Sequence, residues 1–219
     1  MTCDDHPPPA AILGLPRAVH AKLGRLRTPE RIQDFVNTIP WNHAPDGASA
    51  RSVAGVLGAD TANCVEAAFV AACALWLAGH PPLLMDMGAA RGDVDHVVAL
   101  FRRRGHWGAI SKSNSPFLRY RDPIYRTLRE LSLSYFPQYL KGRRKTLRTY
   151  SVPVDLRRHD PALWATHAGF CHTVVDALTA ARHFDILPPG HGDDHLRPID
   201  RIEAVGNDLE EFPRPPRRG

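Results

Sequence analysis

Apolar positions recur at two different spacings along this chain, and the change between them predicts its secondary structure. Within residues 28–40 and again within 61–79, apolar residues return every three or four positions, as on one face of a helix. The runs PLLMDM, DHVVALFRRR and HWGAISK, between residues 82 and 112, are short and apolar, which is typical of strands. The last two flank a turn at Arg104 and Gly105, so we expect them to form an antiparallel pair. Helices therefore come first, and a small antiparallel sheet follows.

The two predicted helices carry recognisable start and stop signals. Thr28 is a suitable N-cap, Pro29 fits the first helical position, and Pro40 ends the first helix. Gly79, which is followed closely by two prolines, ends the second helix. The expected buried stripe of that second helix consists of Val65, Ala68, Phe69, Ala72, Trp76 and Leu77.

Weaker patterns predict the remaining elements and the domain limits. We expect a short helix near 50–57, longer helices over about 122–140 and 160–184, a strand in TLRTYSVPV and a weak helix in IDRIEAVGNDLEEF. Proline and charge are concentrated at both ends of the chain. The chain thus divides into an extended Pro-rich N-terminus (1–16), a single domain (17–185) and a Pro- and charge-rich tail (186–219).

The composition is that of a protein with a substantial core. Hydrophobic residues make up 43% of the 219 residues and charged residues 23%. No apolar run approaches the roughly 20 residues of a membrane helix, and the N-terminus has two acids and no Lys or Arg before a very short apolar run. We therefore expect a cytoplasmic protein whose four cysteines stay reduced. They form no Cys-x-x-Cys pair, which argues against a redox motif or a zinc ribbon.

The charge balance is basic, with 28 Lys and Arg against 23 Asp and Glu. Much of the excess lies in FRRRGHW, KGRRKTLR and RPPRRG. None of these runs interleaves aromatic with basic residues on a recognisable nucleic-acid-binding module, which disfavours nucleic acid as a partner. An acidic small molecule or peptide suits the excess better.

The order of two reactive residues suggests a chemistry. Cys64 lies at the start of the second helix, where the helix dipole and free N–H groups lower the pKa of a thiol and stabilise an oxyanion. His96 opens a later strand and can act as the base. A third polar residue would then orient the imidazole. The alternative is that Cys64 is inert packing and that His96 bonds only to the backbone.

Two motifs in this region resemble the transglutaminase-like superfamily, and its bacterial members in particular. NCVEAAFVAACALWLAGHPP resembles that family's helix, in which Cys-x-(Asp/Glu) precedes small and apolar residues. DHVVALFRRRGHWGAIS resembles its strand-turn-strand unit, which opens with histidine and carries a Gly-x-Trp turn, here Gly105 and Trp107. The resemblance covers residues 28–151, a little over half of the chain. It implies an α+β, papain-like fold, with a Cys-bearing helix packed on a small antiparallel sheet and flanked by other helices.

The resemblance also implies roles for individual residues. Cys64 corresponds to the family's nucleophile and His96 to its general base. The family's third catalytic residue is an aspartate at the end of the second strand, where this chain has Ser111. A hydroxyl can accept the imidazole N–H, but it cannot stabilise an imidazolium as a carboxylate would. Asn114 is an alternative orienting residue, whereas Asp95 should point to the opposite face of its strand.

The expected activity is attack of Cys64 on an amide or related acyl bond of a peptide or small substrate, with hydrolysis favoured over transamidation. Trp107 and Lys112 are the expected substrate-binding residues. Lys112 would bind an acidic group, although it could equally be a solvated charge on a strand edge. The competing interpretation is a binding or scaffold module without turnover, which the missing aspartate favours.

A second cluster lies in THAGFCH, where His167, Cys171 and His172 come together in sequence. His167 and Cys171 would share a helix face, and HGDDH near residue 191 could add ligands. This spacing matches no known zinc motif, so we expect neither a metal nor another cofactor. The sequence leaves the oligomeric state open.

Overall fold

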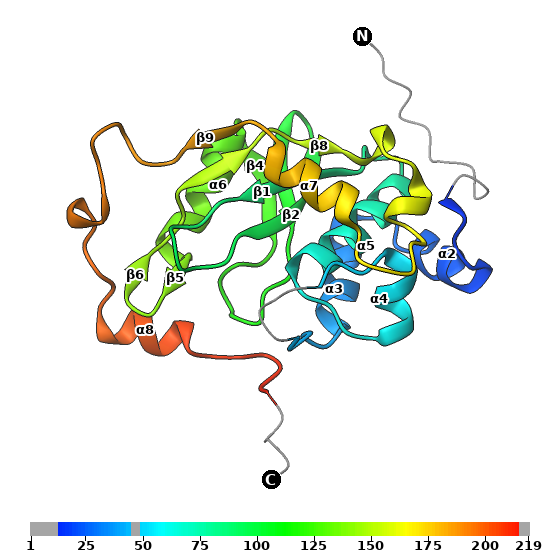
Figure 1. Ribbon diagram of the computed structural model, residues 1–219, viewed down its shortest axis with the longest axis horizontal. Coiled ribbons are helices and arrows are strands. Elements are labelled where there is room, and N and C mark those ends of the chain that lie inside the picture. The colour runs from blue at the N-terminus through cyan, green and yellow to red at the C-terminus, as the bar shows by residue number, and fades with distance from the viewer. Residues whose placement is uncertain (1–12, 45–48, 215–219) are drawn as a thin grey trace.

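A five-stranded antiparallel sheet lies at the centre of the molecule, with helices on both of its faces (Figure 1). The computed structural model describes residues 13–44 and 49–214. The strand order is β4-β3-β2-β1-β8. The strands are β1 (Leu83–Met87), β2 (His96–Arg103), β3 (His106–Ile110), β4 (Arg121–Tyr125) and β8 (Val154–Asp155). The edges of the sheet are β4, which contains Pro123, and β8, which is two residues long.

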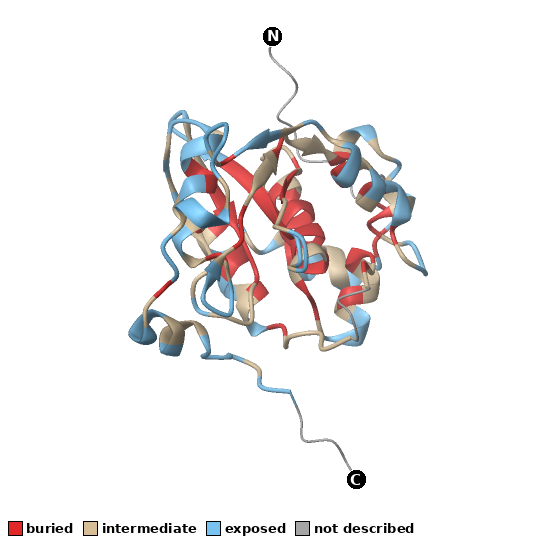
Figure 2. Ribbon diagram, turned by 60° about the vertical axis from the view of Figure 1, so that its left-hand side comes forward, coloured by how far each residue is buried: buried red, intermediate tan, exposed pale blue. Residues whose placement is uncertain are grey.

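Strand β2 separates two hydrophobic clusters. Successive side chains of a strand point to opposite faces, so Val97, Ala99 and Phe101 pack on one side of β2 while Val98 and Leu100 pack on the other. The burial map shows the resulting core where α5 meets the sheet (Figure 2). His96 is the first residue of this strand and pairs with Met87 of β1. This pairing fixes where His96 lies relative to the two clusters.

One face of the sheet is covered by helices from the first part of the chain. Helices α3 (Pro29–Thr38) and α5 (Cys64–Leu77) contact the sheet, and α2 (Arg17–Gly24) and α4 (Val53–Ala59) pack against α5. The other face is covered by α6 (Leu128–Tyr135), followed by the 3-10 turn η2 (Phe136–Gln138) and the hairpin of β5 (Leu140–Lys141) and β6 (Arg144–Lys145). The sheet therefore lies between two helical layers.

The last third of the chain consists of short elements. Strand β7 (Thr149–Ser151) pairs with β9 (His183–Asp185), and α7 (His172–Ala180) packs near β1. Helix α8 (Arg201–Asn207) lies further along. The 3-10 turns of this region are η3 (Leu156–Arg158), η4 (Pro161–Leu163) and η5 (Asp193–His195).

The structure confirms the mixed α and β class, with helices first and a small antiparallel sheet after them. The Thr28 cap is present, since its hydroxyl accepts from the N–H of Arg31 at 3.4 Å. The predicted turn is present as well, and Arg104 and Gly105 both adopt positive φ, 49° and 82°. A tight two-residue hairpin connection needs this backbone conformation.

Three predictions about elements were wrong. The range 122–140 is strand β4 followed by α6, and the range 160–184 contains only the nine-residue helix α7 flanked by a 3-10 turn and strand β9. The one-sided stripe expected on α5 was also wrong. Residues of every face of α5 are buried, including all of 66–75, because the sheet and three other helices surround it. A helix that is apolar all round lies in the core.

The ends of the proposed domain are packed more closely than expected. Leu13 and Leu15 of the predicted extended N-terminus join the core, while residues 1–12, Cys3 among them, lie outside the described residues. Ile186 and Ile199 of the predicted tail are buried, with 2% and 1% of their surface exposed. The first 14 residues of that tail are thus anchored to the fold.

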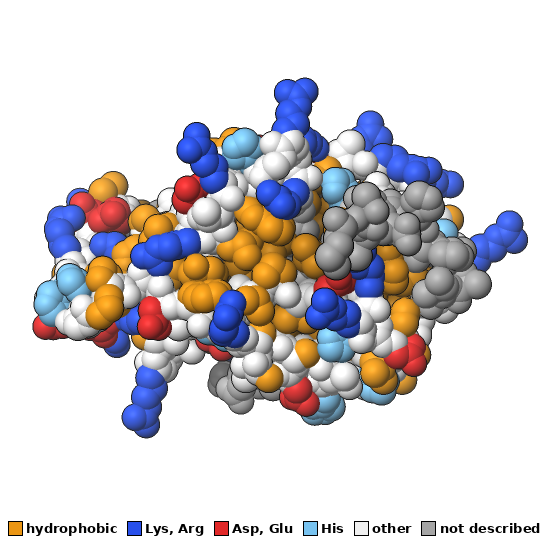
Figure 3. All heavy atoms as spheres, turned by 90° about the horizontal axis from the view of Figure 1, so that it is seen from above, with side chains coloured by type: hydrophobic (Ala, Val, Ile, Leu, Met, Phe, Trp, Pro, Cys, Tyr) orange, Lys and Arg blue, Asp and Glu red, His pale blue; other side chains and the backbone are white. Residues whose placement is uncertain are grey.

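Within the residues that the structure describes, no helix has the length and apolar character needed to cross a membrane. On the face shown in Figure 3, hydrophobic side chains gather in the middle, and Lys and Arg side chains project around them. On this face the basic residues are dispersed and do not form one continuous stripe.

Candidate active site

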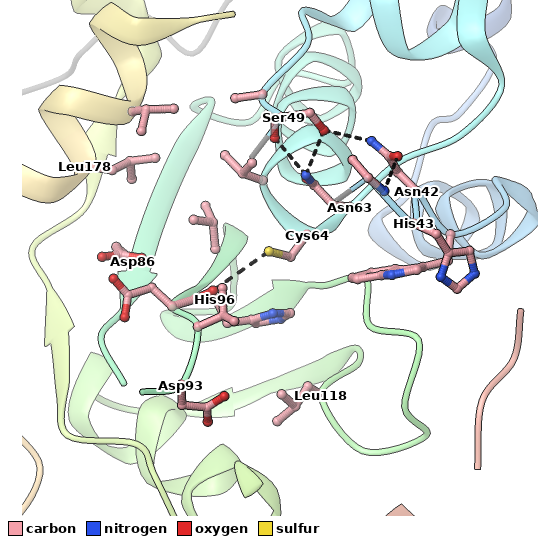
Figure 4. A pocket seen from close by; sticks show the side chains of 18 of the residues that line it. Asn42, His43, Ser49, Asn63, Cys64, Asp86, Asp93, His96, Leu118 and Leu178 are labelled. Carbon is pink, nitrogen blue, oxygen red and sulfur yellow. Dashed lines mark hydrogen bonds between the residues drawn. The ribbon is translucent and has the colours of Figure 1, made fainter. Parts of the chain in front are cut away.

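Cys64 and His96 line the same cavity, which has a volume of about 470 Å³ (Figure 4). Its walls come from the start of α5, residues 41–44 and 49–50, the connection between β1 and β2, and α7. In Figure 4 the Cys64 sulfur points from the helix start toward the beginning of β2, where His96 is located. The two residues singled out from the sequence therefore face one space.

The start of α5 is fixed by a capping box. The Asn63 side chain accepts from the N–H of Glu66, and the Glu66 carboxylate accepts from the N–H of Asn63. This reciprocal pair satisfies two of the free donors at a helix N-terminus. The N–H groups of Cys64 and Val65, at the same helix start, act on the Cys64 sulfur and lower the pKa of the thiol.

Glu66 also holds the loops around the cavity together. Its side chain is fully buried and binds Arg51 through both carboxylate oxygens, at 2.7 and 2.9 Å. It accepts a further hydrogen bond from Asn42. Burial alone would raise the pKa of Glu66, but the bonds from Arg51, Asn63 and Asn42 hold it below the ordinary value. A buried carboxylate thus stays ionised and ties the segments of Asn42 and Arg51 to the helix start.

The Cys64 thiol is not the low-pKa group that its helix position suggests. Burial raises its pKa, and the N–H groups of Val97 and Val65 offset this effect only in part. The sulfur lies 4.0 Å from the carbonyl oxygen of Asp95, its hydrogen-bond acceptor in this structure. The expected pKa depression was therefore wrong in direction, because desolvation outweighs the helix terminus.

His96 is held by the predicted hydrogen bond to Ser111, and the Nε2 to Oγ distance is 2.7 Å. The Ser111 hydroxyl donates its only hydrogen to the carbonyl of Leu118, at 2.8 Å. Toward His96 the serine oxygen must therefore accept, so Nε2 of the imidazole carries the proton. Nδ1 is then left as the proton-accepting nitrogen. The chain His96–Ser111–Leu118 fixes the tautomer as well as the ring orientation.

His96 is neutral at neutral pH. Burial lowers its pKa to about 4, and the positive charge of Arg121 acts in the same direction. Because burial also raises the pKa of the Cys64 thiol, the resting site holds a neutral thiol and a neutral imidazole.

Gln33 positions Ser111 and was missed by the sequence analysis. Its side-chain amide donates to the carbonyl of Ser111 and accepts from the Ser111 N–H, both at 2.9 Å. Gln33 is on α3, 78 residues away in sequence, and only 5% of its surface is exposed. The sequence did contain a signal for this role, because Gln33 follows Ile32 on the apolar face of a predicted helix. A buried amide there needs a hydrogen-bond partner.

The other predicted site residues are not among those that line the cavity. Asn114 does not contact His96 and instead binds the main chain of Phe212. Trp107 is not among the cavity-lining residues. The guanidinium of Arg102 packs over its ring, 4.8 Å from the ring centroid. Lys112 is also absent from the lining. It is 2% exposed and donates to the carbonyl of Val36, so it is neither a solvated edge charge nor part of the cavity wall.

The cavity has an acidic lining that the sequence analysis did not anticipate. Asp86, Asp93 and Asp95 contribute to it, together with Arg214 and two histidines. Asp86 is 6% exposed and binds His183 at 3.2 Å, and burial raises its pKa to about 6. At neutral pH its carboxylate is still mostly ionised. This lining suits a basic group better than the acidic substrate suggested by the net charge.

Similarity to known proteins is found only at the level of structure. No family model matches the sequence, and no curated protein is similar enough to match. Among solved structures, LapG of Legionella pneumophila, treated with EGTA, is similar over 43% of this chain and 59% of its own, with a TM-score of 0.34 and 16% identity. The chain thus matches less than two thirds of LapG. A similarity this weak says nothing about chemistry, which has to follow from the site itself.

The cluster around residue 170 does not form a metal site. Across the described ranges, no group of three or more His, Cys, Asp or Glu side chains is arranged to hold a metal ion. Cys171 is buried at the start of α7, and the ring of His172 packs on Phe170 with 4.4 Å between centroids.

Proposed function

We propose that the chain is a thiol-dependent enzyme of the transglutaminase-like kind that acts on an amide or related acyl bond. Cys64 is the nucleophile, His96 the general base and Ser111 the residue that orients the imidazole. The single observation that carries the proposal is the hydrogen-bond chain from His96 through Ser111 to Leu118. It leaves Nδ1 of His96 as a proton acceptor on a ring that lines one cavity with the Cys64 thiol.

The first half of the reaction begins with a proton transfer. The Cys64 thiol gives its proton to Nδ1 of His96, and the sulfur attacks the carbonyl carbon while the carbonyl π electrons move to oxygen. The imidazolium then returns the proton to the leaving nitrogen as the carbon–nitrogen bond breaks. The products of this half are a free amine and a Cys64 thioester.

The second half releases the acyl group. Water gives a proton to Nδ1 and attacks the thioester, the carbon–sulfur bond breaks, and the proton passes to the leaving sulfur. An amine in place of water would give transamidation by the same steps. We favour hydrolysis, because water is the ordinary acceptor.

The helix start supplies the electrostatic stabilisation that both halves need. The N–H groups of Cys64 and Val65 lower the pKa of the thiol, and the capping box has already satisfied the N–H groups of their neighbours. Preorganised N–H groups of this kind stabilise the oxyanion of a tetrahedral intermediate. The buried Glu66–Arg51 pair keeps them in place.

A binding module without turnover is the second candidate. It is favoured by the raised pKa of the Cys64 thiol and by its contact with the Asp95 carbonyl. It is also favoured by Ser111, since a hydroxyl stabilises an imidazolium less well than a carboxylate.

A panel of fluorogenic peptide amides and thioesters, read by intact-mass spectrometry, separates the two candidates. The enzyme should gain one acyl group that hydroxylamine removes, and Cys64→Ala should gain none. His96→Gln should slow acylation by roughly 100-fold or more, and Ser111→Ala should slow it less. Cys73→Ala, in the same helix but buried away from the cavity, serves as the control with unchanged acylation. Cys64-independent acylation, or none across the panel, would favour the binding module.

A further inference from the structure

The C-terminal segment 211–214 is bound at the edge of the cavity. Asn114 uses its side-chain amide to bind one residue twice: Oδ1 accepts from the N–H of Phe212 at 2.9 Å, and Nδ2 donates to its carbonyl at 3.1 Å. The backbone carbonyl of Asn114 also accepts from the N–H of Glu211, at 2.9 Å. This pairing recognises the main chain of an extended peptide, as an added strand does.

Two further residues complete the contact. Nε2 of His43 lies 2.9 Å from the carbonyl oxygen of Phe212. The buried ammonium of Lys112 lies 5.0 Å from the centroid of the Phe212 ring, a cation–π geometry that is stronger away from water. Main-chain bonds make the recognition general, and Lys112 adds a preference for an aromatic side chain.

The bound segment leads into the cavity. Arg214 donates to the carbonyl of His43 at 3.4 Å, and both residues line the cavity that contains Cys64. In Figure 4, His43 stands at the edge of the cavity opposite Asp86. A basic side chain two residues after the aromatic one therefore reaches a cavity lined by three aspartates.

Little else holds this part of the chain in place. Helix α8, which precedes it, has no buried residue, and Ile202 and Val205 are 72% and 56% exposed. Glu211 also forms an ion pair with Arg119, and both of these side chains are partly exposed. A competing peptide can therefore replace the segment without disturbing the core.

We propose that Asn114, His43 and Lys112 form a binding subsite for an extended peptide with an aromatic residue followed, two positions later, by a basic one. The chain's own residues 211–214 fill this subsite, and such a peptide is the substrate class of the Cys64 site. The second statement rests on the proposed function, whereas peptide binding itself does not require Cys64 to react.

The test measures binding in full-length chains that carry Cys64→Ala, so that no turnover occurs. The probe is a fluorescein-labelled peptide with the sequence DLEEFPRP of residues 208–215, followed by fluorescence anisotropy. Adding Phe212→Ala weakens the chain's own segment, so the peptide should bind at least tenfold more tightly than without that change. Ile202→Ala, on exposed α8, is the matched control and should leave the affinity unchanged.

Asn114→Ala and, separately, His43→Gln are added to the chain with Phe212→Ala, and each should weaken peptide binding at least tenfold. If Asn114→Ala fails to fold, His43→Gln still tests the subsite. Equal affinity for DLEEAPRP, or no effect of either variant in a folded chain, would overturn the subsite. Failure of the enzyme would appear separately, as peptide binding without acylation of the wild-type chain.

Discussion

A neutral thiol beside a neutral imidazole behaves differently from an ion pair. In an ion pair the thiolate is present before substrate arrives, and the reactivity of the cysteine is already maximal below neutral pH. Here burial raises the pKa of the Cys64 thiol and lowers that of His96. In the proposed reaction the proton therefore moves to Nδ1 during the attack itself, which makes the orientation of the imidazole decisive.

Alkylation by iodoacetamide reports on this protonation state. Cys64, which is partly buried, should react before Cys73 and Cys171, which are 0% and 1% exposed. Its rate should keep rising with pH beyond the roughly 8.5 of a free thiol, as followed by peptide mass mapping from pH 6 to 10. A rate that is already constant below pH 7 would indicate an ion pair instead.

His96 should also couple stability to pH. Its pKa is about 4 in the folded chain against an ordinary 6.5, so the unfolded chain binds the extra proton between these values. The contribution of the neutral imidazole to the free energy of unfolding is complete above pH 6.5. It is lost as the pH falls through about 4, and the loss amounts to about 3 kcal/mol. Urea unfolding of the wild type and of His96→Gln at pH 4, 5 and 6.5 measures it. The variant should lose correspondingly less stability over this range.

The comparison with a variant is needed because Asp86 acts with the opposite sign. Its pKa is raised from 3.8 to about 6, so its contribution is largest below pH 3.8 and is lost as the pH rises through 6. In the wild type the two effects partly cancel. A stability difference between wild type and His96→Gln that does not change with pH would contradict the buried, neutral imidazole.

At the scale of elements, the start of α5 depends on a buried ion pair. Removing Arg51 leaves the carboxylate of Glu66 buried without its charged partner, which typically costs about 3–5 kcal/mol. Arg51→Met should therefore lower the free energy of unfolding by about this amount. Arg103→Met is the control, since its pair with Glu30 is 43% and 45% exposed and should contribute at most about 1 kcal/mol. Similar losses for the two variants would contradict this role of Glu66.

The sequence predicted those elements that local signals specify. The cap and the flanking prolines of α3 predict that helix. The two-residue turn at Arg104 and Gly105 predicts the pairing of β2 with β3. Strand β4 was mistaken for helix, because an edge strand tolerates a proline and its neighbour is supplied by tertiary pairing. Local periodicity contains no information about that partner.

The candidate site divides in the same way. Cys64 and His96 were accessible from their places at the ends of elements, and Ser111 from the resemblance to the transglutaminase-like superfamily. The roles of Gln33 and Asn114 were not, because each contacts a segment 78 or 98 residues away. The direction of the Cys64 pKa was also inaccessible, since it depends on how much protein surrounds the sulfur.

At the scale of the whole molecule, the end of the chain is part of the fold up to at least Ile199. Ile186→Ala should lower the free energy of unfolding by about 2–5 kcal/mol, because the side chain is buried in the second hydrophobic cluster. Ile202→Ala, at a position that is 72% exposed, should change it by less than about 0.5 kcal/mol. Thermal unfolding followed by circular dichroism compares the two. A small loss for Ile186→Ala would restore the independent tail predicted to begin at that residue.

The two edges of the central sheet have a consequence for behaviour at high concentration. An open strand edge is a template on which another copy can add a strand and start aggregation. Edge strand β8 offers only two residues, while β4 contains Pro123 and pairs with β3 in a shifted register. Neither edge presents a long, regular row of donors and acceptors. The outermost strands therefore disfavour further strand addition to the central sheet, and concentrated solutions should not aggregate through its edges.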